Sequence, residues 1–432
     1  MISRKPPVTT SFTDKRFPLI RLPRKRGLLW VLAALLISGC AANRGYEIIH
    51  VPETEMTAYL QDKPPELQYY YRKVLTEGRR NLVLNHLRAG LAAMDMGEFD
   101  LAEQSFDTAL LNIEAVFKDD PNAEKARSLW YAEGRKDFKG EPYERAMAYY
   151  YRGLLYMRKG DFENARASFK GGLLQDALAE DEVYRADFAL LIFLEGWTSR
   201  MLGDDGMAEE AFKEVKQFRA DFVPPKFGDN VLLIAETGTA PRKIATGKGQ
   251  SELRFTPGTG FREEKAAVEI GGSVFNGYPM EDIYWQASTR GGREVDKILE
   301  GKAQFKGFNE TMGQTLTGIS AHALSNVGRY GGGEDAAAVA IVAGIIGLVG
   351  LGQQAMAERT RAEADIRQWD NLPDKIHVFT FNSNDQHSRA VPVSFLERRD
   401  KPIPNLNRKA NIHFVNDRFG FAWVRSRSAM GN

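Results

Sequence analysis

The spacing of hydrophobic positions changes once along the chain, near residue 223. From about residue 65 to 222 apolar residues recur every three or four positions among many Ala, Leu, Glu, Arg and Tyr, which predicts amphipathic helices. After residue 223, short β-branched and aromatic runs alternate with Gly, Pro, Asn and Asp, which is typical of strands and turns. We therefore predict an α+β fold, with a helical domain over 65–222 and a β-rich, sandwich-like domain over 223–432.

One pattern of small and aromatic residues occurs three times in the helical region. The copies place Gly, Gly, Ala and Phe at the same offsets: Gly90, Gly97, Ala102 and Phe106; Gly153, Gly160, Ala165 and Phe169; Gly196, Gly203, Ala208 and Phe212. A random chain of this length and composition would contain on the order of 0.02 such matches. The three copies are therefore a genuine internal repeat.

The second copy predicts two antiparallel helices that meet at a tight turn. Pro142 suits the first turn of a helix, and Gly160 suits a left-handed helix terminus. Gly153 and Ala165 are then expected to face each other, because small side chains let two helix backbones approach closely. Phe169 would fill the groove beside them.

This pattern resembles the tetratricopeptide repeat, with Gly153 and Ala165 at its small positions, Phe169 at its aromatic position and Tyr156 at its inner aromatic position. Two departures are visible. The third copy has Asp205 where the others have Phe, and the alanines of successive copies are 63 and 43 residues apart, against about 34 in that family. The resemblance implies stacked helix pairs with a concave surface that holds a peptide, helix or protein partner.

Candidate partner-binding residues lie in the second copy. An insertion over 119–142 lengthens the first interval, and solenoids often place such insertions on the binding face. Tyr149–Tyr151 is a run of aromatic residues, but three adjacent residues of a helix point in three directions, so most of the run is expected to pack internally. We take Tyr149, Arg152 and Tyr156 as the candidate partner-binding residues.

Seven segments of the C-terminal half have strand character: 231–235, 267–270, 282–288, 375–381, 391–395, 411–415 and 420–425. The last two are separated by 416–418, which contains Asn and Asp and favours a hairpin. Strand segments lie on both sides of a helical stretch at about 299–370. We therefore expect one sheet or sandwich built from both parts, with those helices on its face or forming an excursion.

The helical stretch contains sixteen uncharged residues over 336–351, with small residues four positions apart on one side. As a helix this segment would be about 24 Å long, which is shorter than the ~30 Å hydrocarbon core of a bilayer. Three interpretations remain open. The segment is a buried or self-packed hairpin, a membrane contact, or a seam between copies of the chain.

The N-terminus has the pattern of a secretory signal. Basic residues at 24–26 precede an apolar run over 27–37 and the single cysteine, Cys40. Residues 37–40 resemble the lipobox of bacterial lipoproteins, which implies a signal peptide over 1–39, acylation of Cys40 and a lipidated tether and spacer over 40–64. Ala41 resembles the outer-membrane sorting signal, which implies an anchor in the outer membrane facing the periplasm. The alternative is a cysteine that merely ends a transmembrane anchor or a buried apolar run.

The composition and net charge of the chain limit the kinds of partner that it is expected to bind. Hydrophobic residues make up 43% and charged residues 27% of the 432 positions, which is ordinary for a globular chain. Residues 1–39 contain eight of the 58 Lys and Arg and one of the 57 Asp and Glu, so the remainder has 50 basic and 56 acidic residues and a net charge of −6. No basic excess remains to bind nucleic acid.

The sequence shows no pattern that predicts a catalytic or metal site. No two of the six histidines stand at a helical metal-ligand spacing, and the glycines at 247 and 249 lack the spacing of a phosphate loop. His322 stands where a nucleophile elbow needs its second glycine. We expect no catalytic residues, no metal and no cofactor. A hydrolase with an unrecognised constellation is the weakest alternative.

Two further motifs extend the comparison across the chain: AETGTAPRK at 235–243 and EADIRQWDNLP at 363–373. With the lipobox and the repeats, they resemble a family of bacterial outer-membrane lipoproteins that have repeats in front of a β-rich end. In the second motif Trp369 is expected to close a helix and plug the junction of the two domains. The resemblance implies a scaffold that binds an envelope protein in envelope assembly, cell-wall synthesis control or secretion. The alternative is a structural subunit that forms homo-oligomers or inserts in the membrane through 336–351.

Overall fold

The computed structural model describes residues 48–114, 137–177, 187–246, 252–290, 365–383, 390–416 and 418–430. Several predicted features lie outside these residues: the signal peptide, Cys40, the apolar segment 336–351, most of the 119–142 insertion and most of the 299–370 stretch. Residues from Ile49 onward belong to one compact unit, described below.

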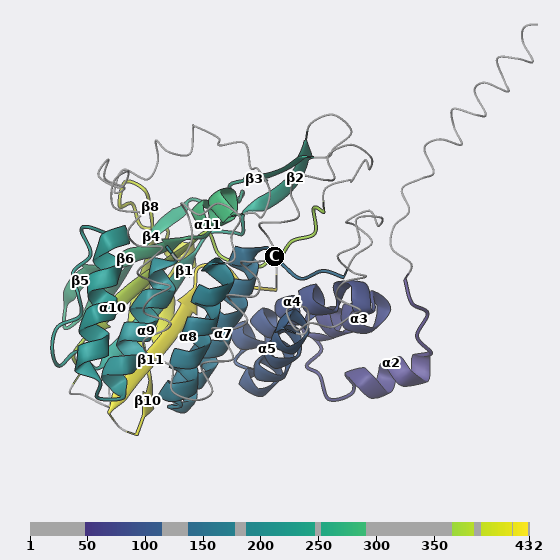
Figure 1. The fold of residues 1–432 in the computed structure, drawn as a ribbon, viewed down its shortest axis with the longest axis horizontal. Helices are drawn as coiled ribbons and strands as arrows, with labels where there is room; N and C mark the ends of the chain where they lie inside the picture. The colour runs from purple at the N-terminus through teal and green to yellow at the C-terminus, as the bar shows by residue number, and fades with distance from the viewer. Residues whose placement is uncertain are drawn as a thin grey trace, which may run out of the picture. The chain divides into compact units, whose positions relative to one another are not determined.

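The helical part contains three antiparallel pairs at the positions of the three repeats (Figure 1). The pairs are α4 (Leu82–Met96) with α5 (Phe99–Glu114), α7 (Pro142–Lys159) with α8 (Phe162–Ala177), and α9 (Ala189–Met201) with α10 (Asp205–Phe218). Before them come α2 (Glu53–Leu60), α3 (Gln68–Thr76) and the short 3-10 helix η2 (Arg79–Asn81). The helical repeat predicted from the sequence is confirmed.

The first helix of every pair stops at a glycine. Gly97, Gly160 and Gly203 have φ of +83°, +78° and +84°, a left-handed conformation that side chains with a Cβ rarely adopt. Helix α7 begins at Pro142, and the Glu141 side chain completes a capping box at its N-terminus. Local sequence therefore fixes both ends of this helix.

The first glycine of each repeat makes room for the phenylalanine of the same repeat. A Cβ built on the glycine would lie 3.1 Å from the ring for Gly90 and Phe106, 2.3 Å for Gly153 and Phe169, and 2.9 Å for Gly196 and Phe212. The alanines of the pattern, Ala102, Ala165 and Ala208, are fully buried. The atoms that a Cβ on Gly153 would meet first are thus ring atoms of Phe169, while the predicted approach of Gly153 to Ala165 stays a prediction.

The strands form two sheets and a ribbon. The five-stranded sheet has the order β10 (His413–Val415), β11 (Phe419–Arg425), β1 (Val231–Thr237), β7 (Lys375–Phe381), β6 (Tyr278–Asp282). The four-stranded sheet has the order β5 (Ser273–Asn276), β4 (Glu263–Ile270), β8 (Ala390–Glu397), β9 (Arg408–Asn411). β2 (Arg242–Thr246) pairs with β3 (Glu252–Thr256), and the short helices α11 (Ile283–Arg290) and η7 (Pro404–Leu406) complete the unit.

Both sheets combine strands from the two sides of the 299–370 stretch, as the sequence predicted. β1 pairs antiparallel with β7 and parallel with β11, and β4 pairs antiparallel with β8. The predicted hairpin joins β10 to β11, with Asn416 in a left-handed conformation.

Two strand predictions were wrong in detail. Residues 283–290 are the helix α11, because the Asp282 side chain accepts a hydrogen bond from the Trp285 amide and caps its first turn. The predicted strand 411–415 is divided at Ile412, where the chain passes from one sheet to the other. Strands β2, β3, β5 and β6 were missed, and Trp369 lies in extended chain and not at the end of a helix.

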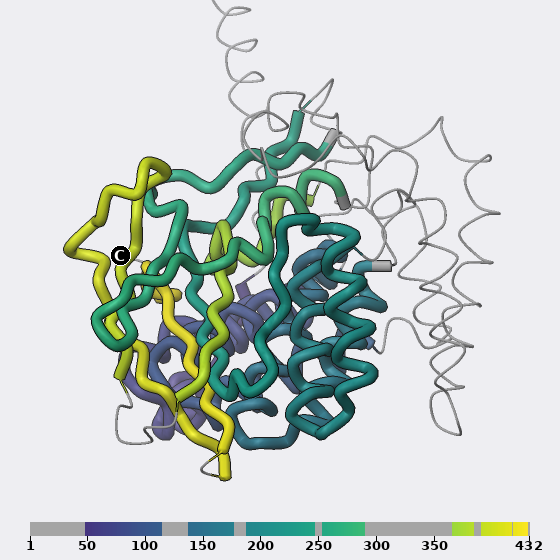
Figure 2. The backbone as a smooth tube through the Cα atoms, turned by 90° about the vertical axis from the view of Figure 1, so that its left-hand side faces the viewer, coloured from purple at the N-terminus to yellow at the C-terminus, as the bar shows by residue number. Residues whose placement is uncertain are grey.

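The five-stranded sheet is the middle of three layers (Figure 2). Leu232 and Ile234 of β1 join the core shared with the helices, and Val231, Leu233 and Ala235 join the core shared with the four-stranded sheet. All seven residues of β1 are consequently buried. The change near residue 223 marks the passage from helices to strands, while one hydrophobic core extends through both.

The contact between Gly153 and Phe169 gives a graded test of the repeat packing. We expect Gly153→Ala to lower the free energy of unfolding by about 1–3 kcal/mol, because the new methyl group overlaps the ring. Gly90→Ala should cost less, because its Cβ has more room. Urea unfolding checks both, and Phe169→Leu in the Gly153→Ala background should recover part of the loss. An equal loss in the free energy of unfolding for Gly153→Ala and Gly90→Ala would contradict this packing.

Candidate functional site

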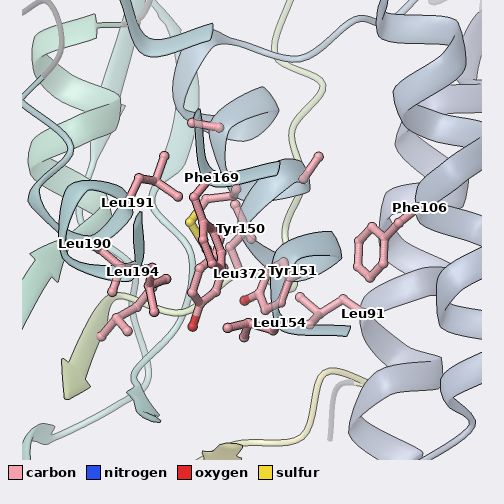
Figure 3. Packing of buried hydrophobic residues seen from close by; sticks show 14 of the residues in the cluster. Leu91, Phe106, Tyr150, Tyr151, Leu154, Phe169, Leu190, Leu191, Leu194 and Leu372 are labelled. Carbon is pink, nitrogen blue, oxygen red and sulfur yellow. The ribbon is translucent and has the colours of Figure 1, made fainter. Parts of the chain in front are cut away.

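One face of the helical repeats is filled by the rest of the chain. The hydroxyls of Tyr150 and Tyr151 in α7 donate to Glu236 of β1, and the Leu190 amide at the start of α9 donates to Glu281 of β6. Arg88 of α4 donates to Asp370, in the segment that precedes β7. In Figure 3, Tyr150, Tyr151 and Leu154 of α7 lie between Leu91 and Phe106 on one side and the leucines of α9 on the other. We call this covered side of the repeats the inner face.

The centre of the inner face is a buried carboxylate, Glu236 of β1. Its oxygens accept hydrogen bonds from the hydroxyls of Tyr150 and Tyr151, both at 3.1 Å, and from the Trp423 indole at 2.9 Å. The Arg425 guanidinium lies 3.2 Å away, and neither charged side chain is more than 4% exposed. Two adjacent tyrosines of one helix thus hold a single carboxylate of the sheet.

Burial dominates the electrostatics of this group. Burial raises the pKa of Glu236, and Arg425 and the three hydrogen bonds counteract that rise. The pKa values of Tyr150 and Tyr151 are raised by burial and by the Glu236 charge, so both hydroxyls remain donors. A buried carboxylate with an arginine and three donors holds the helices to the sheet and has no capacity left for a ligand.

A second buried carboxylate, Glu144 of α7, holds an extended strap over residues 365–374. Glu144 accepts the Trp369 amide at 2.6 Å and pairs with Lys243 of β2 at 3.2 Å. Lys243 also pairs with Glu141 at 3.0 Å and donates to the Arg367 carbonyl. Burial alone would lower the pKa of Lys243, but the two carboxylates outweigh it and raise the pKa, so Lys243 stays protonated.

The strap crosses from α7 to α4. Trp369 is fully buried, with its ring centroid 6.2 Å from Phe106 and 5.7 Å from Tyr151. Arg88 of α4 pairs with Asp370 at 2.7 Å and donates to the strap backbone. The sequence singled out this motif as a plug, and its tryptophan is indeed enclosed by two repeats.

A third buried carboxylate, Glu281 of β6, lies beneath the last repeat. It accepts the amide of Leu190 at the start of α9 and pairs with Arg219 at 3.1 Å, and Gln286 donates to it at 3.0 Å. Burial raises the pKa of Glu281 to about 7, against the opposing charge of Arg219. Each repeat after the first is therefore tied to the sheet by its own carboxylate.

The sequence-predicted partner-binding residues lie on the opposite side of α7. At 100° per residue, Tyr149, Arg152 and Tyr156 point away from Tyr150 and Tyr151. Arg152 pairs with Glu103 at 2.7 Å and Asp107 at 2.6 Å, both on α5. Its guanidinium carbon lies 3.7 Å from the centroid of the half-buried Tyr156 ring.

These contacts form an outer seam, which we define as Glu103, Asp107, Leu111 and Glu114 of α5 with Tyr149, Arg152, Tyr156 and Lys159 of α7. The Tyr149 hydroxyl donates to Glu114 at 2.7 Å, and burial together with this bond raises the pKa of Tyr149. Leu111 is 65% exposed in the middle of the seam. An exposed leucine on the helix that carries these charged contacts offers an apolar contact to a protein partner.

The second helix pair corresponds to a known repeat. Residues 143–175 match the tetratricopeptide repeat. The match covers α7 and α8, the pair that carries Gly153, Ala165 and Phe169. No curated protein and no solved structure matches the chain. Tetratricopeptide repeats generally bind protein partners, so the repeat supports a role in protein–protein interaction.

Other kinds of site were sought in the described residues. Among them, no group of three or more His, Cys, Asp or Glu is placed to hold a metal ion, and no helix is long and apolar enough to cross a membrane. Burial lowers the pKa of His377 to about 3, and the ring lies 3.3 Å from the Thr237 hydroxyl. A hollow of about 160 Å³ beside Met56 and Leu60 is smaller than the ~300 Å³ that ligand pockets usually need.

The Glu236 network can be tested by truncation. We expect Glu236→Ala to lower the free energy of unfolding by about 3–5 kcal/mol, because Arg425 is left buried without its partner. Tyr150→Phe and Tyr151→Phe should each cost about 1–3 kcal/mol. Tyr69→Phe, at an exposed site, is the matched control and should change little. Urea unfolding followed by tryptophan fluorescence measures all four, and a fully stable Glu236→Ala chain would refute the network.

Glu281 predicts a pH dependence of stability. Its folded pKa, about 7, exceeds the ordinary 4.5, so folding favours the protonated acid. The stabilisation is complete below pH 4.5 and is lost as pH rises through 7, by roughly 3 kcal/mol in total. Glu281→Gln should remove this slope and gain stability relative to the parent chain between pH 5 and 8. Urea unfolding between pH 5 and 8 tests this prediction, with Glu209→Gln at an exposed position as the control. If the free energy of unfolding depends on pH in the same way for the parent chain and Glu281→Gln, the prediction is contradicted.

Proposed function

We propose that this chain is a lipid-anchored scaffold of the bacterial outer membrane, facing the periplasm, whose helical repeats bind another envelope protein. The observation that supports the proposal is the set of three helix pairs, one of which matches the tetratricopeptide repeat. The setting would be envelope assembly, cell-wall synthesis control or secretion. The chain would act by binding, without catalysis and without a cofactor.

The partner would dock on the outer seam. The inner face of the repeats is filled by β1, β11 and the strap, and the carboxylates of Glu236 and Glu144 are bonded within the chain. The outer seam instead presents Leu111 and the edge of Tyr156 beside the charges of Asp107 and Lys159. Acylation of Cys40, inferred from its lipobox, would keep this surface at the membrane.

The second candidate function is a structural subunit that forms oligomers or inserts in the membrane through 336–351. It is favoured by the small-residue spacing of that segment, which lies outside the described residues. The two proposals differ in what a deletion of 336–351 should do, because a scaffold would keep its partner and an oligomeric or inserted subunit would lose its assembly.

Crosslinking in intact envelopes followed by pull-down tests the scaffold. We expect the chain to recover a specific protein partner, and Leu111→Glu to reduce the recovery at least about tenfold, because a charge would enter the centre of the outer seam. Val223→Glu, at a site 78% exposed after α10, is the matched control and should recover the partner normally. Recovery of no partner, or equal recovery with Leu111→Glu, would refute docking at the seam.

The same experiment tests the anchor in a separate arm. Cys40→Ser should release the product from the membrane fraction or block its processing, because the acylated sulfur is lost. Unchanged processing and membrane attachment would refute lipidation while leaving the partner result intact.

A further inference from the structure

The connection between β8 and β9 concentrates positive charge at one edge of the molecule. Its residues 398–409, here called the basic lobe, contain five cations and one carboxylate: Arg398, Arg399, Lys401, Arg408 and Lys409, with Asp400. The lobe belongs to the four-stranded sheet, on the side of the molecule opposite the helices (Figure 2). The proposed signal and tether contribute nothing to this charge.

Four of these cations have no partner within the part of the chain that the structure describes. Arg398, Arg399, Lys401 and Lys409 are exposed, and neither a hydrogen bond nor an ion pair engages their side chains. The only carboxylate of the lobe, Asp400, is paired with Lys265 of β4 at 2.7 Å. Asp400 therefore neutralises Lys265 and leaves the four cations of the lobe without a neutralising carboxylate among the described residues.

The lobe holds its cations on a fixed backbone. The buried Ile403 donates its amide to the Phe395 carbonyl at 2.9 Å, and Pro402 bridges to Leu396. The guanidinium of Arg408 donates to the carbonyls of Asn407 and Ser426, both at 3.1 Å. The charges are consequently presented as a group, and little ordering is needed when they meet a ligand.

We propose that the basic lobe binds the anionic headgroups of a phospholipid bilayer. The large apolar residues of the lobe are Ile403, which is buried, and Leu406, which packs partly buried against the core of the two sheets, so the lobe has no fully exposed aromatic or aliphatic anchor of the kind that a stable protein interface uses. Exposed cations without an apolar anchor favour binding to a lipid bilayer, because anionic lipids can diffuse in the membrane and gather beneath the cations.

This contact would act independently of acylation. A lipid chain at the N-terminus restrains one point of the molecule, whereas the lobe would add a second contact and so set which side faces the bilayer. Since the lobe and the helices lie on opposite sides of the sheets, the outer seam would then point away from the membrane, toward a partner.

Vesicle sedimentation tests the proposal. All described elements lie in the compact unit from Ile49 onward, so the chain from Ala41, without Cys40, can be used and lipidation plays no part. We expect binding to phosphatidylcholine vesicles that contain phosphatidylglycerol at low salt, and loss of binding at about 0.5 M salt. Arg398→Gln with Arg399→Gln should weaken binding about 25-fold, or about fivefold for each cation.

The matched control removes the same charge from the helical layer. Lys213→Gln with Lys216→Gln, on exposed positions of α10, should change binding less than about twofold. Circular dichroism and urea unfolding should show both double variants folded, because none of the four side chains is buried. Absence of binding to anionic vesicles, equal binding to pure phosphatidylcholine, or equal weakening by both double variants would overturn the proposal.

Discussion

The fold depends on a carboxylate that two neighbouring tyrosines hold from one side and an arginine from the other. Glu236 lies in the middle strand of the molecule, and its partners Tyr150 and Tyr151 lie in the middle repeat. A charge buried so deeply is tolerable only while every partner is present. Removing any one of these partners would leave a buried polar or charged group unsatisfied.

The attachment of the sheet to the repeats limits which face of the repeats is accessible to a partner. Repeats of this kind usually expose a long surface on which a partner lies. Here the sheet, the strap around Trp369 and the C-terminal residues occupy one face, so the surface left for the proposed partner is the outer seam, where Leu111 is exposed. The β-rich part thus fills one face of the repeats, and the outer seam is formed by α5, the second helix of its pair, and α7, the first helix of the next pair.

The sequence was most informative where a residue acts locally. The turn at Gly160, the hairpin at Asn416 and the pairing of strands across 299–370 followed from spacing and turn chemistry. Which side chains of distant segments meet could not be predicted. Glu144, Glu236 and Lys243 have nothing in their local pattern that marks them as buried partners, since only the assembled layers bring them together. A charged residue at the end of the otherwise apolar strand 231–235 was the one available signal.

The position of β1 within the chain has a consequence for biogenesis. This strand is completed by residue 237, yet its two neighbours end at residues 381 and 425. During synthesis or export, Tyr150 and Tyr151 of α7 and the apolar strand β1 therefore lack part of their native contacts until residues 375–425 have emerged. The most deeply buried strand of the fold is therefore among the last to gain both of its neighbours.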